Sequence, residues 1–440
     1  MYCIYYTAHH NWQWLIAEAF SKLFEQKQNI KLEACKRFKD LPSNQNGKSK
    51  PKYALLRFDV TEGTALQIAF RLESEAFAFL DPKDSLYSTL SALDMKDIMP
   101  KTTLINWDFD DDADKIPSLP TQPALLKAPL GSGGFGLYFV QNSNDILELI
   151  KAHRLRAMRE PGFLDKINTD YAKTHSVMAW SLQALIQPLK VVPPSEKISR
   201  TPDVKMRKSQ IRAYAVYHNR EIFLYKTFEV RLPTWDEDVD ETLQSPTANK
   251  SAWSEEVENE YGGAGDARPY NEKRNKQLTE RYVISEIEEL IPAIPCLEDC
   301  VKRTLSGLKH TILSKVIQEE IGDDYSDRDE RMAVVGIDLL VTESAATQCF
   351  DEDSKASASG RRESLSKYSA FVVEMNHNPA MPNPAKHHMS SKYKEHLLVL
   401  VSSLILLGLE AVEIMEDASD INSISIKSMK QQAVERFHKM

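Results

Sequence analysis

Short apolar runs and one stretch with helical spacing fill the start of the chain. The runs CIYYT (3–7) and YALLRFDV (53–60) are rich in aromatic and aliphatic residues, which is typical of strands. The segment WLIAEAFSKLFEQ (14–26) has apolar residues three and four apart, as on one face of a helix. ALQIAFRLES (65–74) is predicted to form a second helix. Together these elements predict a small α/β domain over residues 1–80.

The next part of the chain alternates helices and strands around one loop. A helix is expected near Pro82, because proline and aspartate favour the first turn of a helix. The predicted helices cover 81–90 and 144–158, and the predicted strands cover 99–106, 124–130 and 137–140. This pattern predicts a central domain over residues 81–182.

Residues 183–440 are predicted to form a third domain of paired strands. Two strands are expected within 211–232, around a His-Asn-Arg turn. The apolar runs VVGIDLLVT (334–342) and SAFVVEMN (369–376) are predicted strands, and they can pair with each other as a hairpin interrupted by a long excursion. An amphipathic helix is predicted over 280–320.

Two segments of this third domain have no apolar periodicity. They cover 234–279 and 343–368, and we predict that both are mobile insertions without a fold of their own. The long uncharged run at 397–409 is predicted to be a buried helix, because it is shorter than the ~20 residues that span a bilayer.

Composition indicates a globular protein and narrows its partners. The chain has 440 residues, 42% of them hydrophobic, with a net charge of −9, which excludes a wholly disordered chain and disfavours binding to nucleic-acid phosphates. Five scattered cysteines indicate a reducing environment rather than a disulfide scaffold. We therefore expect a cytoplasmic protein with neither a nucleic acid nor a membrane as its partner.

Glycine is concentrated in one loop, GSGGFG. Its members include Gly131, Ser132, Gly133, Gly134 and Gly136. Without side chains in the way, backbone N–H groups in such a loop can reach phosphate oxygens. A strand follows the loop, whereas a dinucleotide-binding turn requires a helix there. The H-R-D and D-F-G tripeptides of protein kinases are missing, and Lys127 precedes the loop. A phosphate-covering hairpin is predicted, with a tight turn that binds nothing as the alternative.

Acidic and basic side chains are placed within the apolar strands. Glu374 and Asn376 share one face of a strand because side chains alternate, and Asp338 joins them if its strand pairs alongside. Carboxylate and amide oxygens suit Mg²⁺, with acids at a solvated strand end as the alternative. Arg212 and Arg231 also lie in apolar strands, where a planar guanidinium suits phosphate or carboxylate. The cluster Lys205, Arg207 and Lys208 is expected to be a solvated charged face.

These segments, in this order, resemble the ATP-grasp superfamily, and most closely the tubulin tyrosine ligase-like enzymes. ALLKAPLGSGGFGLYFV resembles the lysine strand, phosphate loop and following strand of that family, and SLQALIQPL resembles its hinge. KMRKSQIRAYAVY and YKTFEVRL resemble its two arginine strands. GIDLLV and VVEMNHNPAMP resemble its closing metal-binding motifs, and DPKDSLYSTL resembles the lysine-led helix before its central domain.

The resemblance implies an α/β (α+β) ATP-grasp fold. A Rossmann-like N-terminal domain would precede central and C-terminal α+β domains that hold ATP between them. Gln183 and Leu185 would lie against the adenine, and Lys83, Lys127 and the glycine loop would bind the phosphates.

The resemblance also implies the roles of the remaining residues. One or two Mg²⁺ ions would be held by Asp338, Glu374 and Asn376, and Arg212 and Arg231 would act on the acyl phosphate.

The activity implied is ATP-dependent joining of a carboxylate to an amine through an acyl phosphate. The partners would be an amino acid and a peptide or protein, tubulin among them. A small-molecule kinase of the same architecture, acting on an inositol phosphate, is one alternative. A nucleotide-binding interaction protein that has lost catalysis is the other.

Overall fold

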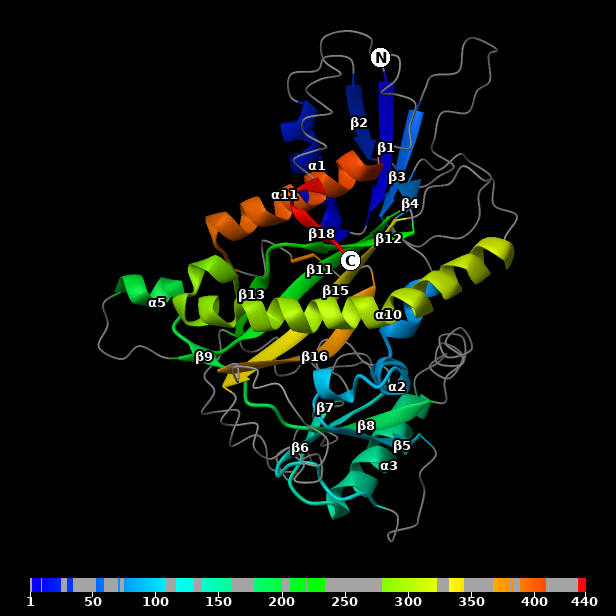
Figure 1. The fold of residues 1–440 in the computed structure, drawn as a ribbon, viewed down its shortest axis with the longest axis vertical. Helices are drawn as coiled ribbons and strands as arrows, with labels where there is room; N and C mark the ends of the chain where they lie inside the picture. The colour runs from blue at the N-terminus through cyan, green and yellow to red at the C-terminus, as the bar shows by residue number, and fades with distance from the viewer. Residues whose placement is uncertain are drawn as a thin grey trace, which may run out of the picture.

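The structure is a computed structural model with a mixed α+β fold (Figure 1). It describes residues 2–8, 10–24, 30–34, 53–58, 70–71, 75–107, 116–129, 137–159, 178–199, 206–218, 220–233, 279–322, 332–343, 367–377, 379, 381–382, 388–408 and 434–440. The described strands form a four-stranded parallel sheet near the N-terminus, a second four-stranded sheet, a large eight-stranded sheet and one two-stranded pair.

The N-terminal sheet has the strand order β2-β1-β3-β4, and its neighbouring strands are parallel. Its strands are β1 (Tyr2–Ala8), β2 (Ile30–Ala34), β3 (Tyr53–Phe58) and β4 (Phe70–Arg71). The predicted strands and the predicted helix α1 (His10–Phe24) are confirmed. The predicted helix over 65–74 is wrong at Phe70–Arg71, because the edge of β3 offers backbone partners that override a local helical pattern. Residues 65–69 and 72–74 of this prediction lie outside the described residues.

The second sheet has the order β5-β8-β6-β7 and antiparallel neighbours. Its strands are β5 (Thr102–Asn106), β6 (Ala124–Lys127), β7 (Leu137–Val140) and β8 (Ala179–Ala184), with helix α3 (Asn144–Arg159) after β7. Leu126, Trp180 and Leu182 pack with Ile146 and Ile150 of α3 on one face. The strands on both sides of the glycine loop pair as predicted, while the loop itself lies outside the described residues.

The large sheet runs in the order β16-β15-β11-β13-β14-β17, with β12 also paired to β11 and β18 paired to β12. Its strands are β11 (Gln210–His218), β12 (Glu221–Tyr225), β13 (Glu229–Pro233), β14 (Thr279–Val283), β15 (Met332–Glu343), β16 (Tyr368–His377), β17 (His388–Met389) and β18 (Phe437–Lys439). The predicted pairing of the two apolar runs is confirmed, because β15 and β16 are antiparallel neighbours.

Two predictions for this sheet need correction. Residues 211–232 hold three strands instead of two. A strand is interrupted at 226–228, and the segment after the interruption, β13, pairs with the start of β11. The α-helix predicted over 280–320 begins only at Ile294, as α10 (Ile294–Gly322), because β14 first pairs with β13. Two 3₁₀ helices, η5 (Ile284–Glu286) and η6 (Glu288–Ala293), lie between β14 and α10. Pro295, at the start of α10, suits the first turn of a helix.

The two segments predicted to be mobile lie largely outside the described residues. At their described ends, Thr279 begins β14, Glu343 ends β15 and Tyr368 begins β16, so these three positions belong to strands.

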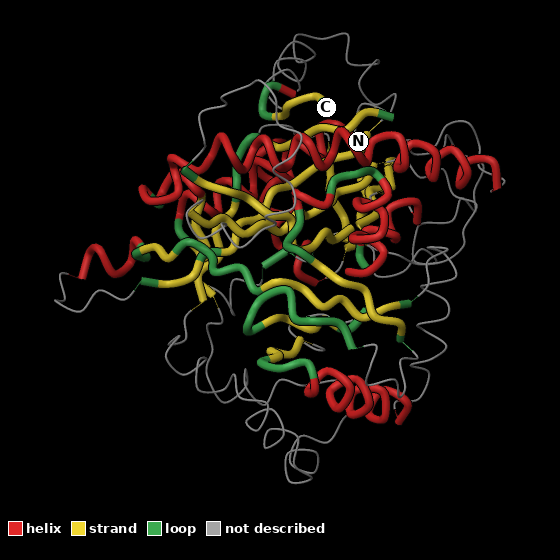
Figure 2. The backbone as a smooth tube through the Cα atoms, turned by 60° about the horizontal axis from the view of Figure 1, so that its bottom comes forward, coloured by secondary structure: helices red, strands yellow, loops and turns green. Residues whose placement is uncertain are grey.

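Helices cover both faces of the large sheet. Alternate residues of β11, such as Ile211 and Ala213, pack in one core with α10, whereas Tyr214 and Val216 pack in the other core with α1 and α11 (Ser391–Gly408). Figure 2 shows the strands in the interior with helices on the outside. Among the described residues no helix is long and apolar enough to cross a membrane, and α11 is buried as predicted for 397–409.

Short strands and helices outside the three larger sheets complete the arrangement. The connection after β8 contains β9 (Lys190–Val191), the helix α5 (Pro194–Ser199) and β10 (Arg207–Lys208). Helix α2 (Lys83–Ala92), predicted from 81–90, lies between the second sheet and the large sheet (Figure 1).

Candidate active site

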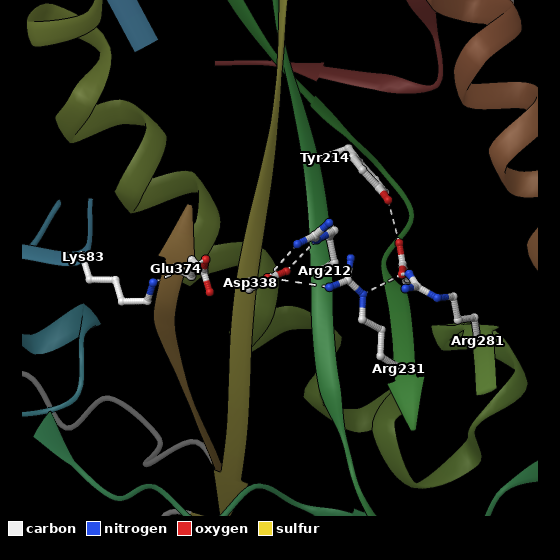
Figure 3. Close-up of polar contacts among 8 residues, drawn as sticks. Lys83, Arg212, Tyr214, Arg231, Arg281, Asp338 and Glu374 are labelled. Carbon is white, nitrogen blue, oxygen red and sulfur yellow. Dashed lines mark hydrogen bonds and ion pairs between the residues drawn. The ribbon is translucent and has the colours of Figure 1, made fainter. Parts of the chain in front are cut away.

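A row of charged side chains crosses four strands of the large sheet. Glu374 is paired with Asp338, Asp338 with Arg212, and Arg212 with Glu229. Directly paired residues in an antiparallel sheet project to the same face. The row therefore lies on one face, in line with Tyr214, which follows Arg212 by two residues (Figure 3).

Asp338 and Arg212 form the centre of the row. Arg212 donates two hydrogen bonds to the Asp338 carboxylate, Nε to Oδ1 at 2.6 Å and Nη2 to Oδ2 at 2.7 Å. Arg231 Nη1 lies 3.7 Å from Asp338 Oδ2. Burial would raise the pKa of Asp338, but the two guanidinium groups outweigh it and lower that pKa. Asp338 is therefore a buried, ionised carboxylate.

Glu229 anchors the other end of the row. It is fully buried and accepts hydrogen bonds from Arg231 Nε at 2.7 Å, from Tyr214 Oη at 2.6 Å and from Arg281 Nη1. Burial would raise the pKa of Glu229, yet the surrounding guanidinium groups hold it well below its ordinary value. Sequence reasoning missed Glu229 and Arg281, although an acid two residues before Arg231 in an apolar strand was an available signal.

Two lysines stand at the opposite end. Lys83 Nζ lies 3.9 Å from Glu374 Oε1. Lys127 is buried on β6, and burial together with the positive charge of Lys83 lowers its pKa to about 8, while Glu374 acts in the opposite direction. Lys127 and Glu374 therefore influence each other although they belong to different sheets.

Helix α2 holds Lys83 between these sheets. Asp84, next to Lys83, accepts a hydrogen bond from the backbone N–H of Ala179 on β8 at 2.9 Å. Asp81, just before the helix, accepts one from the backbone N–H of His377 on β16 at 2.7 Å and also contacts the His377 ring. The start of α2 is thus fixed to both sheets.

Two buried polar atoms in this region have no partner among the described residues. They are Asn376 Nδ2, whose strand position pairs with Gly336, and Ser181 Oγ, whose position pairs with Lys127. An unsatisfied buried polar atom costs roughly 1–3 kcal/mol. A polar ligand beside Lys127 and Asn376 would remove that cost.

Glycine at position 336 makes room for the central arginine. A Cβ atom added there would lie 3.3 Å from Arg212 Nε and 3.0 Å from Pro379 Cβ. The glycine of the GIDLLV motif therefore lets the Arg212 guanidinium pass over β15 to Asp338.

The remaining predicted residues differ in their outcome. Gln183 Nε2 donates to Thr102 Oγ1 at 3.1 Å, and the backbone N–H of Leu185 donates to Thr121 Oγ1 at 2.9 Å. Their role at adenine stays a prediction. The site residues Gly131, Ser132, Gly133, Gly134 and Gly136 lie outside the described residues.

Arg207 departs from the expected solvated cluster. It is partly buried and donates to Glu280 Oε1 at 2.7 Å and to Glu196, so it ties β10 to β14 and α5. Lys205 lies outside the described residues.

The donors of the site fit a hard cation. Glu374 and Asn376 share a face of β16, and Asp338 lies on the neighbouring strand, as the sequence predicted. All three offer oxygen atoms, the donors that Mg²⁺ prefers. Within the described ranges no group of three or more His, Cys, Asp and Glu side chains could hold a metal, so phosphate oxygens or water would have to complete the set.

Cationic side chains gather at the site. They are Lys83, Lys127, Arg212, Arg231 and Arg281, and the carboxylates beside them are Asp81, Asp84, Glu229, Asp338 and Glu374. Arg231 and Arg281 converge on Glu229, whereas Lys127 is buried near a second lysine, Lys83. An anion bound beside these two lysines would offset their mutual repulsion.

The fold and the site define an α+β protein with a cationic site between two sheets. No protein-family model and no curated protein matches the sequence. Among solved structures, the chain is similar to the C-terminal domain of Pby1 from K. lactis, an ATP-grasp enzyme interacting with the mRNA decapping enzyme Dcp2. That match has 10% identity and a TM-score of 0.44 and covers 92% of each chain.

Two further solved structures are bacterial enzymes. The D-alanine–D-alanine ligase from Bacillus anthracis, complexed with ATP, matches at 10% identity with a TM-score of 0.41 over 98% of both chains. The D-alanyl-alanine synthetase A from Vibrio cholerae matches at 11% identity with a TM-score of 0.41, over 92% of this chain and 98% of that one. All three TM-scores lie below 0.5, so these similarities do not assign a function to this chain.

Proposed function

We propose that the protein is an ATP-dependent carboxylate–amine ligase of the ATP-grasp superfamily. The observation that carries the proposal is the position of α2 between the two sheets: Lys83 approaches Glu374 of the large sheet to 3.9 Å, and Asp84 accepts a hydrogen bond from the backbone of β8 in the sheet that carries Lys127. A phosphate-sized anion between them would meet Lys127 from β6, Lys83 from α2 and the arginines of the large sheet. The glycine loop connects β6 to β7, directly after Lys127, so it is well placed to cover the same phosphates.

The residues divide into three roles. Lys83 and Lys127 bind phosphate oxygens as point charges, which is the usual contribution of lysine to such sites. Asp338, Glu374 and Asn376 would hold Mg²⁺, which would neutralise negative charge on the phosphates. Arg212 and Arg231 lie beside these donors and orient the anionic group that reacts.

The proposed reaction has two steps, formation of an acyl phosphate and formation of an amide. An oxygen of the substrate carboxylate attacks the γ-phosphorus, the bond to the β-γ bridging oxygen breaks, and ADP leaves with an acyl phosphate formed. The amine of the second substrate then attacks the acyl carbon, inorganic phosphate leaves, and the amine proton passes to solvent or phosphate. Arg212 and Arg231 stabilise the negative charge that develops on the acyl oxygens. No covalent enzyme nucleophile is needed.

The substrates belong to the tubulin tyrosine ligase-like class in this proposal. One is an amino acid and the other a peptide or protein, with tubulin as one candidate. A screen of amino acids and peptides for ATP-dependent phosphate release identifies the pair.

Glu374→Gln tests the proposal, because it removes one charged donor and keeps the shape of the side chain. We expect ADP formation to be abolished while the far-UV circular dichroism and the unfolding midpoint stay close to those of the wild type. Glu343→Gln is the matched control, since Glu343 ends β15 and its side chain is 53% exposed. Near-normal ADP formation by Glu374→Gln contradicts the metal assignment.

A small-molecule kinase remains the second candidate, because the gathering of lysines and arginines also suits a phosphorylated alcohol. The product separates the two: an amide-linked adduct supports the ligase, and a phosphorylated alcohol supports the kinase. Absence of any stabilisation by ATP in thermal unfolding supports a binding protein without a working nucleotide site.

A further inference from the structure

A cavity of about 670 Å³ lies beside the start of β16, where α10 and the segment between α2 and β5 meet this strand (Figure 1). Its volume is within the range of sites that take a small organic ligand. None of the described residues assigned above to phosphate, Mg²⁺ or the acyl phosphate lines it. The cavity is therefore separate from the candidate active site.

The inner wall of the cavity is rich in sulfur atoms and aromatic rings. Met99, Cys300 and Phe371 line it and are only 4%, 5% and 6% exposed, while Tyr87 of α2 and Tyr368 of β16 are half-buried. Burial raises the pKa of the Cys300 thiol to about 12, so this thiol stays protonated and is an apolar contact rather than a nucleophile. Sulfur atoms and rings both make favourable contacts with an aromatic ring. A flat aromatic group fits this wall.

Charged side chains stand at the mouth of the cavity. Lys96, Lys101 and Arg303 are exposed there, as are Asp97 and Asp299. Asp97 accepts a hydrogen bond from Arg303 Nη2 at 2.6 Å, and this bond raises the pKa of Arg303, with Asp299 adding to the effect. Because both acids act on Arg303, the other charges that a ligand meets at the mouth are the two lysines. The mouth favours an anionic group over the ammonium group of an amino acid.

The cavity touches the strand that holds the predicted adenine hinge. Thr102 is part of its wall, and Thr102 Oγ1 accepts a hydrogen bond from Gln183 Nε2 at 3.1 Å. The neighbouring carbonyl of Lys101 accepts one from the backbone N–H of Ala184 at 2.7 Å. The opposite wall belongs to α10 and β16 of the large sheet. A molecule in the cavity would therefore contact the second sheet and the large sheet together.

We propose that this cavity is a second ligand site, which takes a small aromatic anion without an amino group. The ring would lie against Met99, Cys300 and Phe371, and the anionic group would meet Lys96 and Lys101 at the mouth. A ligand held there would join the two sheets without taking part in the reaction. The site does not depend on the proposed ligase function.

Binding of fluorinated probes tests the cavity without ATP. The ¹⁹F line width of para-trifluoromethylbenzoate is measured by NMR as the full chain is titrated, and a Kd of about 1 mM or lower is expected for a ligand of this size. The neutral para-trifluoromethylbenzamide and the amino acid para-trifluoromethylphenylalanine should bind about threefold more weakly or less well still. No binding of the benzoate overturns the site, and equal binding of all three probes contradicts the class of ligand.

Two variants show whether the probe occupies this cavity. Ala370→Phe fills it from β16, where Ala370 is a half-buried wall residue and phenylalanine suits a strand, so benzoate affinity should fall about tenfold or more. The double variant Lys96→Gln, Lys101→Gln leaves the cavity open and should lower benzoate affinity about threefold, which decides the case if Ala370→Phe does not fold. Lys302→Gln is the matched control, because Lys302 pairs with Glu298 on α10 and does not line the cavity. Unchanged affinity in the lysine variant, or in a folded Ala370→Phe, overturns the proposal.

Cys296 reports the position of the probe in the wild type. It is a half-buried wall residue whose thiol donates to the Tyr368 carbonyl oxygen at 3.3 Å. Alkylation of Cys296 by N-ethylmaleimide, followed by mass spectrometry, should slow about fivefold when the benzoate is present at about four times its Kd. Absence of protection places the probe elsewhere and contradicts the proposal. Competitive displacement of the probe by ATP with Mg²⁺ would place it in the nucleotide site and overturn the proposal as well.

Discussion

Lys127 combines deep burial with a charge that is lost near neutral pH. Burial and the neighbouring Lys83 lower its pKa to about 8, so the free protein loses this charge as the pH rises through that value. If Lys127 binds phosphate, ATP affinity should fall by up to about fivefold between pH 8 and pH 9, because only the protonated form attracts the ligand. Isothermal titration across this range measures the effect.

Lys127→Arg is the matched variant for that experiment. Arginine stays charged throughout, so its ATP affinity should be nearly independent of pH over the same interval. A wild-type profile that is flat, or one that Lys127→Arg does not change, removes Lys127 from the phosphate site.

Glu229 is expected to have the largest effect on stability. Glu229→Gln leaves Arg231 and Arg281 without their buried anion, which should cost about 3–5 kcal/mol in the free energy of unfolding. Because the folded pKa of Glu229 is lowered, its contribution is present above its ordinary value of 4.5 and is lost as the pH falls below it. Urea unfolding from pH 7 to pH 3 checks both effects.

Tyr214→Phe is the milder comparison, since it removes only the hydroxyl that donates to Glu229 and should cost about 1–2 kcal/mol. The free energy of unfolding of Glu229→Gln should fall less steeply with decreasing pH than that of wild type. If it falls just as steeply, the pH dependence comes from other carboxylates, such as Asp338.

The sequence predicted part of the site at this scale. Period two placed Glu374 and Asn376 on one face, and apolar pairing brought Asp338 beside them. The contact of Asp338 with Arg212 joins positions 126 residues apart, so no local pattern reveals it. Arg281 is also out of reach, because the sequence pattern predicts a helix at its position, whereas it lies on β14.

Gly336 of β15 leaves the space through which Arg212 reaches Asp338. In Gly336→Ala the added Cβ would press on Arg212 Nε and Pro379 Cβ, so β15 or the guanidinium must shift. We expect a loss of about 1–3 kcal/mol in stability and, in the proposed ligase, a marked fall in kcat/KM. Gly307→Ala on α10 is the control: its Cβ meets only the flexible Met95 side chain, and ATP affinity should be unchanged.

Equal activity in Gly336→Ala and wild type would show that Arg212 tolerates displacement and does not orient the reacting group. Thermal unfolding and ATP-dependent phosphate release, measured on the same preparations, separate a loss of fold from a loss of function.

Elements were predictable where one local pattern dominated. The strands β6, β7, β15 and β16 are short apolar runs, and the structure confirms them. The apolar spacing at the start of 280–320 is ambiguous and predicts a helix, whereas pairing with β13 makes Thr279–Val283 a strand, and two 3₁₀ helices follow it. The sequence predicts β12 and β13 as one strand, because residues 226–228 between them include neither glycine nor proline to indicate a turn.

At the scale of the whole molecule, α2 is the connection between the second sheet and the large sheet. Asp84 binds the backbone of β8, Asp81 binds His377 of β16, and Lys83 extends between them to Glu374. A nucleotide held between the sheets therefore depends on the position of this helix. The domain boundaries near residues 80 and 182 stay predictions.

Asp84→Ala tests whether α2 sets the relation of the two sheets. It leaves the buried N–H of Ala179 without its acceptor, which should cost about 1–3 kcal/mol. We expect faster hydrogen exchange in β5, β6 and β8, little change in β11 and β15, and weaker ATP binding although Asp84 lies outside the predicted phosphate contacts. If β11 and β15 exchange faster to the same extent, both sheets unfold as one unit, and α2 stabilises the whole fold without setting how the two sheets are placed. If exchange is local but ATP affinity is unchanged, the nucleotide does not depend on how α2 joins the sheets, and the placement of the site between them is wrong.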